Sequence, residues 1–271
     1  MSGTLYVVAT PIGNLEDVTL RALRVLREVS LVASEDTRTT RRLLSHHGVK
    51  ARIVSYTEHN MARRTPEILR TLDTGDVALV SEAGTPGVSD PGAELIAAVV
   101  AAGFSVSPVP GPAAVIAALT ASGLSLRRFT FLGFAPRRGK ERRDLFARFA
   151  SAPETLVFFE SPHRLHKSLT DLKAALGDRR LAACRELTKM YEEVFRGYVS
   201  QAIDHFTEPR GEFTIVVEGG SDKPAGVSDE GILNALQRLR EAGASNRDAV
   251  AQVSRELGVP RRRAYNLALK D

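Results

Sequence analysis

The chain has 271 residues, of which 43% are hydrophobic and 25% are charged, and this globular composition excludes a wholly disordered protein. Its net charge of +5 favours polyanionic or phosphate-bearing partners. Its one cysteine, Cys184, excludes an intramolecular disulfide scaffold and a thiolate metal cluster, and it fits a reducing, cytoplasmic location.

The first residues, 1–9, lack the basic region and cleavage pattern of a signal peptide, so we expect them to belong to the fold. The most apolar stretches, 95–104 and 113–119, are shorter than the roughly 20 residues that cross a bilayer. The sequence therefore predicts no membrane span and no membrane partner.

Short apolar runs in the first 110 residues predict the strands of one mostly parallel sheet. The run 5–9 has no polar alternation, which is typical of a strand buried on both faces. Helical patterns separate the runs, and this alternation indicates an α/β layer protein. The predicted strands are 5–9, 31–33, 51–55, 77–81 and 105–109, and the predicted helices include 20–29, 66–72 and 92–102.

After the turn at Gly111 the apolar runs lie farther apart, which predicts a second sheet domain, and the turn-forming stretch 219–226 predicts a linker. The predicted strands are 129–132, 155–159, 181–184 and 212–217, with helices at 113–121, 138–150 and 163–176. The predicted domains are 1–112, 113–222 and 228–271.

The tail beyond the linker contains no strand pattern. Ser228 and Ser245 can cap helices over 228–241 and 245–258, and Pro260 marks the start of a third helix. Three short helices with a basic third start resemble a helix-turn-helix bundle. The net charge of this tail is only +2, so we do not expect a strong autonomous nucleic-acid binder.

Three loops rich in Gly, Pro, Ser and Thr follow predicted strands, at 10–14, 81–92 and 109–112. Neither the dinucleotide-binding GxGxxG nor the phosphate-binding GxxxxGK[ST] motif is present. In a parallel sheet such loops gather at the carboxyl ends of the strands and line one crevice. The loops predict a cleft for an adenosine-containing cofactor, whereas the alternative for each loop alone is a simple turn.

Seven motifs can be compared with known families. They are LYVVATPIGNL at 5–15, SEDTR at 34–38, SEAGTPGVSDPG at 81–92, PGP at 110–112, FLGF at 131–134, FESPHR at 159–164 and CRELTK at 184–189. Together they resemble the S-adenosylmethionine-dependent tetrapyrrole-methylase superfamily, and within it the bacterial branch that methylates the ribose 2′-hydroxyl of a cytidine in small-subunit (16S) ribosomal RNA. The helical tail resembles that branch as well, so the resemblance covers essentially the whole chain.

The resemblance implies two αβα domains with S-adenosylmethionine in the cleft between them, and a homodimer acting on small-subunit ribosomal RNA or the assembled 30S subunit. AGTP at 83–86 replaces the GDP usual in tetrapyrrole enzymes, which fits the RNA branch. One departure is that the alanines after the PGP turn supply no hydroxyl. The residues implied to bind the cofactor are Pro11, Glu82, Ala83, Gly84, Asp90, Ala113, Ala114, Leu132, Gly133 and Phe134.

Methyl transfer to a ribose hydroxyl needs alignment, and a nearby base or cation should help remove the hydroxyl proton. We favour Asp36 and Arg38 for substrate positioning and Glu160 for binding the target nucleotide or orienting the cofactor. A salt bridge or helix cap is the alternative for each charged residue. No metal site is expected, because no fourth ligand accompanies Glu160, His163 and His166. The full set of acid, base and cation candidates is Glu35, Asp36, Glu82, Glu160, Glu186 and Lys189.

Basic residues concentrate in 127–143, which holds seven Lys or Arg and one acid. Such a segment would hold structured RNA by its phosphates, and the alternative is a solvated helix face. Arg38, Arg41 and Arg42 form a second basic strip. The residues predicted to contact RNA are Arg137, Arg138, Lys140, Arg142 and Arg143.

The sequence thus predicts a cytoplasmic ribosomal RNA methyltransferase. The alternative enzyme is a tetrapyrrole C-methyltransferase, which the basic segment and the helical tail disfavour. An alternative of another class is a nucleic-acid-binding regulator, in which the tail binds nucleic acid and the α/β domains sense a small molecule.

Overall fold

The structure is a computed structural model, and it describes residues 3–220 and 229–269. The predicted helix cap Ser228 and most of the predicted linker, 221–226, lie outside the described residues.

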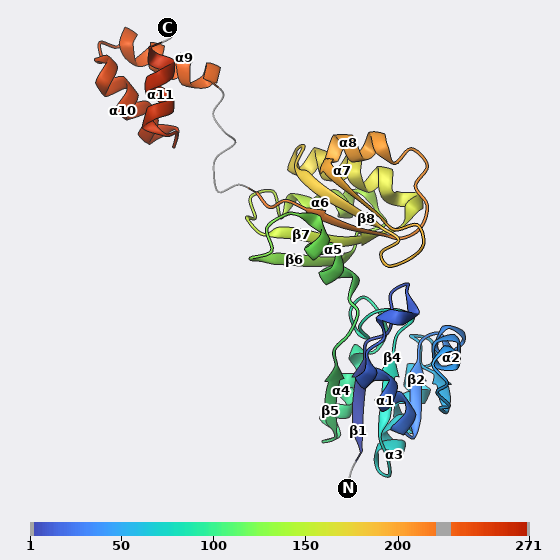
Figure 1. The fold of residues 1–271 in the computed structure, drawn as a ribbon. Coiled ribbons are helices and arrows are strands. Elements are labelled where there is room, and N and C mark those ends of the chain that lie inside the picture. Colours follow the sequence, from blue (N-terminus) through green and yellow to red (C-terminus); the bar gives the residue numbers. More distant parts are fainter. Residues whose placement is uncertain (1–2, 221–228, 270–271) are drawn as a thin grey trace. The chain divides into compact units, whose positions relative to one another are not determined.

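The chain divides into two compact units, each with its own core (Figure 1). One comprises Met1–Arg148 and Glu154–Glu218 and contains two β-sheets. The other comprises Phe149–Pro153 and Gly219–Asp271 and contains the last three helices. The domain boundary predicted at residue 112 falls between the two sheets of the first unit and stays a prediction.

The first sheet is parallel throughout, in the order β3-β2-β4-β1-β5. Every residue of β2 and β4 is buried, because helices cover both faces of the sheet. All five strands expected in this half of the chain are present. They are β1 (Thr4–Val8), β2 (Leu31–Ser34), β3 (Ile53–Ser55), β4 (Val77–Val80) and β5 (Ser105–Val109).

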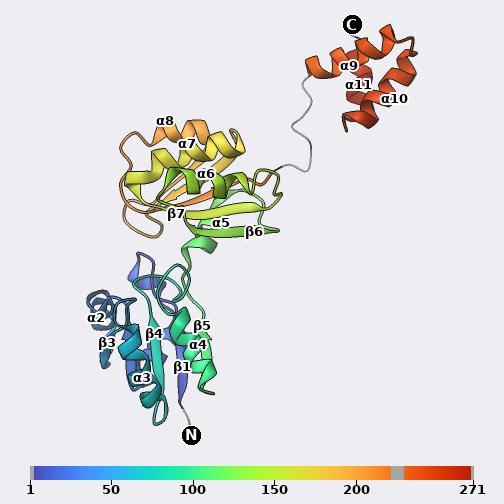
Figure 2. The same cartoon turned by 180° about the vertical axis from the view of Figure 1, so that it is seen from behind.

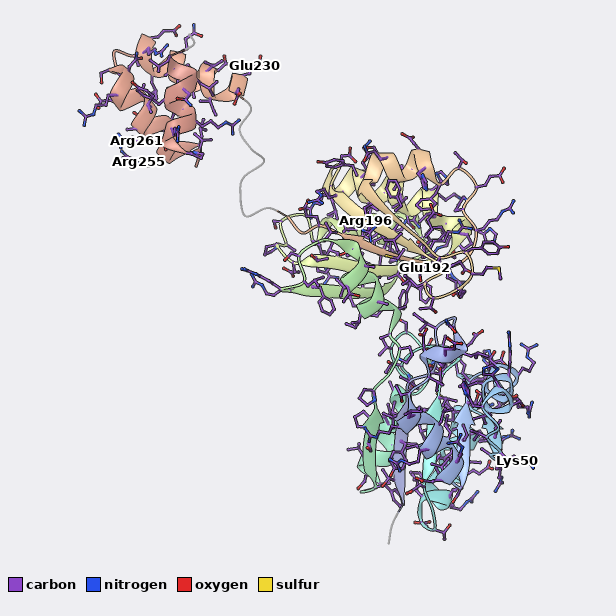
Figure 3. The ribbon with its side chains drawn as sticks, viewed as in Figure 1. Lys50, Glu192, Arg196, Glu230, Arg255 and Arg261 are labelled. Carbon is purple, nitrogen blue, oxygen red and sulfur yellow. The ribbon has the colours of Figure 1, made fainter. Side chains whose placement is uncertain are left out.

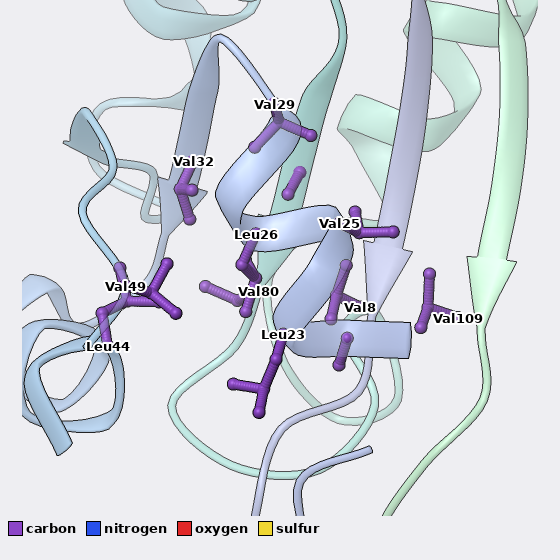
Figure 4. Packing of buried hydrophobic residues seen from close by; sticks show 12 residues of the cluster. Val8, Leu23, Val25, Leu26, Val29, Val32, Leu44, Val49, Val80 and Val109 are labelled. Atoms are coloured by element: carbon purple, nitrogen blue, oxygen red, sulfur yellow. The ribbon is translucent and has the colours of Figure 1, made fainter. Parts of the chain in front are cut away.

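Helices α1 and α2 cover one face of this sheet, where Leu26 and Leu44 join a cluster with Val80 (Figure 4). Helices α3 and α4 cover the opposite face through Ile68 and Leu95 (Figure 2). The helical elements are η1 (Leu15–Asp17), α1 (Leu20–Glu28), α2 (Thr37–His46), α3 (Met61–Leu72) and α4 (Ala93–Ala101). Because all strands of this sheet are parallel, their carboxyl ends lie at one edge, where the predicted loops begin.

The second sheet is mixed, in the order β6-β7-β10-β8-β9. Only the β6–β7 pair is parallel among the pairs of the described sheet. Four of its strands match the apolar runs in the sequence. The sequence did not predict the edge strand β9 or the helix after it, and β9 is half-exposed and carries charged residues. The strands are β6 (Phe129–Phe134), β7 (Thr155–Glu160), β8 (Arg180–Arg185), β9 (Glu193–Tyr198) and β10 (Phe213–Val217).

Helix α5 packs on one face of the second sheet, with Val115 and Leu119 against Val216. The other helices lie on the opposite face (Figures 1 and 2), where the rings of Phe146 and Phe158 pack 5.4 Å apart. The helical elements are α5 (Ala114–Ser122), α6 (Gly139–Ala147), η2 (Pro162–Arg164), α7 (Leu165–Leu176) and α8 (Val199–His205).

The second unit is a three-helix bundle of α9 (Asp229–Glu241), α10 (Asn246–Glu256) and α11 (Arg261–Ala268), with its own apolar cluster. Ser245 caps α10 as predicted, because its hydroxyl accepts the Asp248 N–H at 3.2 Å. The longest described helix is α9, with 13 residues, and no described helix is long and apolar enough to cross a membrane.

Candidate functional site

A cavity of about 780 Å³ lies in the first unit and is lined from both sheets. The first sheet contributes the loops after β1 and β4, the residues after the Pro-Gly-Pro turn, and one side of α2. The second sheet contributes residues of β6 and β7 and of the chain around β8 and β10. The predicted loops 10–14 and 81–92 therefore both line one site, as expected at the carboxyl ends of parallel strands, whereas the third loop, 109–112, only precedes the lining residues 113–116.

The loops after β1 and β4 are joined by a backbone bridge. Thr10 and Gly84 exchange two N–H···O bonds, at 2.9 and 3.0 Å. Gly84 has a φ of +77°, which favours glycine. At Gly111 an added Cβ would lie 3.1 Å from the Cβ of Ala9, so the turn after β5 also approaches the end of β1 closely.

Among the described residues, Thr10 places an unpaired buried hydroxyl at the cavity. The residue is 4% exposed, and its hydroxyl has no hydrogen-bond partner in the described part of the chain. It also lines the cavity. Buried hydroxyls are almost always paired, so this one suits a hydrogen bond to a molecule bound in the cavity.

The first-sheet side of the cavity is acidic. Glu82 and Asp90 line it, and Glu35 lies beside them, accepting the Glu82 N–H at 3.2 Å. Burial, with the neighbouring Glu35 and Glu82 carboxylates, raises the pKa of Asp90 to about 6. Burial also raises the pKa of Glu35. Because a nearby cation would relieve this repulsion, the acidic side suits a positively charged ligand.

On the second-sheet side, Lys189 is held between two carboxylates. Its Nζ lies 2.9 Å from Glu186 Oε1 and 2.9 Å from Glu212 Oε2. Burial lowers the pKa of Lys189, but the bonds to these carboxylates outweigh it and hold the pKa above its ordinary value. The raised pKa keeps the Lys189 ammonium charged.

The loop that carries Lys189 is strained. Glu186 and Thr188 have φ values of 48° and 65°, a region unfavourable for a β-branched residue such as threonine. The Thr188 hydroxyl accepts the Asn14 N–H at 3.1 Å, and a Cβ at Gly13 would lie 2.5 Å from Lys189 Cγ. The loop after β8 is thus packed against the turn after β1.

Glu160, predicted for catalysis, is 1% exposed at the end of β7. Its two carboxylate oxygens accept Arg164 Nε at 2.8 Å and Arg164 Nη2 at 3.0 Å, and the Ser168 hydroxyl also donates to it. These partners engage the carboxylate within the protein. Glu160 also lines the cavity, and its part in catalysis stays a prediction.

Asp36 and Arg38 were predicted to position the substrate. Asp36 caps α2 by accepting the Arg38 N–H at 2.7 Å, and it pairs with Arg38 Nη2 at 3.1 Å. The bonds from Arg38 lower the pKa of Asp36. Neither residue lines the cavity, whereas Thr39 and Arg42 of the same helix do. The helix-cap alternative accounts for Asp36, and Arg38, with 88% of its side chain exposed, stays available to an external ligand.

Most residues implied to bind the cofactor gather around the cavity. Leu132 and Gly133 lie within β6 and are not among the lining residues. The predicted residues that line it are Pro11, Glu82, Ala83, Gly84, Asp90, Ala113, Ala114 and Phe134.

The basic segment places most of its predicted RNA contacts at the surface, around the start of α6. Arg137, Arg138, Lys140 and Arg143 are exposed. Arg142 is the exception, at 4% exposure, because its guanidinium donates to Asp171 at 2.5 and 2.9 Å and to the carbonyl of Pro136. The prediction that Arg142 contacts RNA is therefore not carried forward.

Several lining residues were not selected from the sequence. Thr10 was detectable, because a polar residue at the end of a buried strand is typical of a site. Thr39 and Leu43 were not, and Arg42 was named only as part of the second basic strip, because only the packing of α2 shows which of its sides borders the cavity.

A model of one protein family, described as tetrapyrrole (corrin/porphyrin) methylases, matches residues 4–203. A protein of Halalkalibacterium halodurans named ribosomal RNA small subunit methyltransferase I is 44% identical over 98% of this chain and 94% of its own length. A protein of the same name from Synechocystis sp. is 45% identical over 99% of this chain and 98% of its own length.

Solved structures show the same fold at lower identity. The uroporphyrin-III C-methyltransferase of Thermus thermophilus aligns with a TM-score of 0.57 and 24% identity, over 80% of this chain and 94% of its own. A cobalt precorrin-4 methyltransferase aligns with a TM-score of 0.60 and 18% identity, over 79% and 94%.

Proposed function

The chain belongs to the tetrapyrrole methylase family, and we propose that it is a methyltransferase of small-subunit ribosomal RNA. The observation that carries this proposal is 44–45% identity, over nearly the whole chain, to proteins named for that activity. The finer proposal is that S-adenosylmethionine is the methyl donor and the 2′-hydroxyl of a cytidine ribose is the acceptor.

The cavity fits this donor in charge and in hydrogen bonding. The sulfonium and ammonium groups of S-adenosylmethionine outweigh its one carboxylate, which suits the acidic side formed by Glu82 and Asp90. The unpaired hydroxyl of Thr10 would donate to it or accept from it. The residues proposed to hold it are Thr10, Pro11, Glu82, Ala83, Gly84, Asp90, Ala113, Ala114 and Phe134.

When bound, S-adenosylmethionine supplies an electrophilic methyl group that a ribose hydroxyl accepts by in-line displacement. The protein's part is alignment and exclusion of water. The bridge between Thr10 and Gly84 fixes the loops on one side, and the ion pairs of Lys189 fix the loop on the other. The methyl–sulfur bond would break as the methyl–oxygen bond forms, S-adenosylhomocysteine would leave, and the hydroxyl proton would pass to water. Lys189 would offer its charge to the acceptor oxygen as that proton leaves.

The exposed cations around the start of α6 support an RNA acceptor over a porphyrin. Charge reversal of Arg137 and Arg138, which lie outside the cavity lining, should weaken RNA binding and its salt dependence while cofactor affinity is unchanged. Unchanged RNA affinity would make this segment a solvated face.

We also propose that the enzyme acts in the cytoplasm as a homodimer. Light scattering that shows only monomer would contradict the dimer.

The direct test is to incubate the protein and radiolabelled S-adenosylmethionine with small ribosomal subunits, and separately with free 16S RNA, from a strain lacking the enzyme. Nuclease digestion and mass spectrometry should place the label on one cytidine ribose. Label on a porphyrin-type acceptor, with none on either RNA substrate, would overturn the RNA proposal.

A further inference from the structure

Helix α2 separates the cavity from a second hollow of about 370 Å³. The cavity is bordered by Thr39, Arg42 and Leu43, and the hollow by Arg41, Leu44 and Ser45. Because successive residues of an α-helix are about 100° apart, these two sets lie on nearly opposite sides of α2. One helix thus contributes to the walls of two different recesses.

The two recesses differ in charge. The cavity is lined by several carboxylates, whereas the charged residues lining the hollow are Arg41 and Lys50, and no described carboxylate lines it. Figure 3 shows Lys50 at the outer surface of the first sheet's half of the unit. A recess with two cations and no acid suits a phosphate group.

The exposed side of α2 connects the two recesses with further cations. By the same 100° spacing, Arg38 lies between Arg41 and Arg42 on the side opposite the buried Thr40 and Leu43. Arg38 pairs with Asp36, and Arg41 donates to the Thr37 hydroxyl at 3.3 Å. We name Arg38, Arg41, Arg42 and Lys50 the α2 strip.

We propose that the α2 strip docks the ribose–phosphate backbone of the RNA that carries the acceptor nucleotide, with one phosphate in the hollow at Arg41 and Lys50. This rests on the proposed function. The strip runs from the hollow to Arg42 at the cavity, so RNA bound along it has a nucleotide at the cavity. It lies on the first sheet, whereas the basic segment at α6 lies on the second, and the two would hold the RNA independently.

The test is the double variant Arg41→Gln, Lys50→Gln, with binding to isolated small ribosomal subunits measured over a range of KCl concentrations at fixed Mg²⁺. Each lost phosphate contact lowers the slope of log affinity against log salt by about 0.7 to 0.9. Because the hollow holds one phosphate, the expected result is a slope reduced by about 0.7 to 0.9, with the affinity for S-adenosylmethionine unchanged.

The matched control is Arg70→Gln, Lys173→Gln, which removes the same charges from exposed positions outside both recesses. The charge-retaining variant Arg41→Lys, Lys50→Arg should keep the wild-type slope. A wild-type slope in the glutamine variant, or an equal loss in the control, overturns the proposal. If the double variant fails to fold, Lys50→Gln alone decides, because Lys50 lies outside any helix or strand.

Binding does not depend on turnover, which separates the two proposals. Absence of methyl transfer by the wild type would refute the proposed function, but the salt dependence of RNA binding could still be measured in the wild type and the variant. Methyl transfer by the wild type together with an unchanged slope in the variant would refute the α2 strip alone.

Discussion

At the scale of single residues, a few groups at the cavity have unfavourable surroundings or backbone conformations. Thr10 buries a hydroxyl without a described partner, Asp90 lies near the Glu35 and Glu82 carboxylates, and Glu186 has a φ of 48°, a conformation that favours glycine. Such groups cost folding free energy, and they persist where the surrounding structure fixes them. Their concentration at one cavity marks it as the functional site.

The carboxyl of Asp90 should make stability depend on pH. Its pKa of about 6 in the folded chain lies above that of the unfolded chain, so protonation favours the folded state. This stabilisation is fully present below about pH 4 and is lost as the pH rises through 6. The melting temperature of Asp90→Asn should therefore exceed that of the wild type at pH 7.5 and match it near pH 4. Equal melting temperatures at pH 7.5 would contradict the shifted pKa.

Gly84 should be essential for cofactor binding. At a φ of +77° a valine is strained by about 1 to 3 kcal/mol, and relief of that strain would break the bridge to Thr10. Gly84→Val should lose S-adenosylmethionine binding in calorimetry. Gly103→Val is the matched control, because Gly103 has a φ of +82° with no atom near its Cβ position and lies outside the cavity. Unchanged cofactor affinity in Gly84→Val would remove this loop from the site.

At the scale of elements, the site is built from connections rather than from helices or strands. The loops after β1 and β4 are bonded to each other, and the loop after β8 is bonded to the turn after β1 through Thr188. The strands fix where each loop begins, and these contacts fix where it ends. A disturbance in one loop should therefore reach the others.

Gly13→Ala tests this coupling. The new Cβ would lie 2.5 Å from Lys189 Cγ and 2.9 Å from the Leu187 carbonyl oxygen, so the loop after β8 would have to move. We expect a methyl-transfer rate at least tenfold lower, with a loss of stability below about 2 kcal/mol by urea unfolding, because few residues outside the loop are affected. Gly48→Ala is the control for strain without crowding, since Gly48 has a φ of +62° and nothing lies within 4 Å of its Cβ position. Wild-type activity in Gly13→Ala would show that the loops act independently.

At the scale of the whole molecule, the cavity belongs to one unit and the three-helix bundle is the other. Each unit buries its own apolar cluster, so each should fold alone. A chain ending at residue 220 should retain wild-type affinity for S-adenosylmethionine, and the bundle alone should bind RNA poorly. Tight RNA binding by the isolated bundle, measured by filter retention, would favour a regulator instead.

The sequence by itself determined the class of fold, because short apolar runs separated by helical patterns mark strands. Five such runs match the strands of the first sheet, of which β2 and β4 are buried along their whole length. Its motifs determined the family, which the family model confirms over residues 4–203. It did not reveal β9, because Glu193 and Arg196 interrupt the apolar residues of this half-exposed edge strand. The strand therefore has no continuous apolar run. The loops that line the cavity were found because glycine and proline constrain them visibly.

Only the tertiary structure decided which charged residues face a ligand. Arg142 and Arg143 are adjacent in one basic segment, yet Asp171, about 30 residues away, buries the first and leaves the second at the surface. For Glu160 the sequence left a functional acid and a salt bridge open, and the structure shows Arg164 and Ser168 bonded to its carboxylate. A side chain's partner depends on contacts between distant segments, and local sequence does not encode those contacts. For the same reason the sequence did not predict the two recesses beside α2. Only the packing of α2 on its sheet shows which of its residues border each recess.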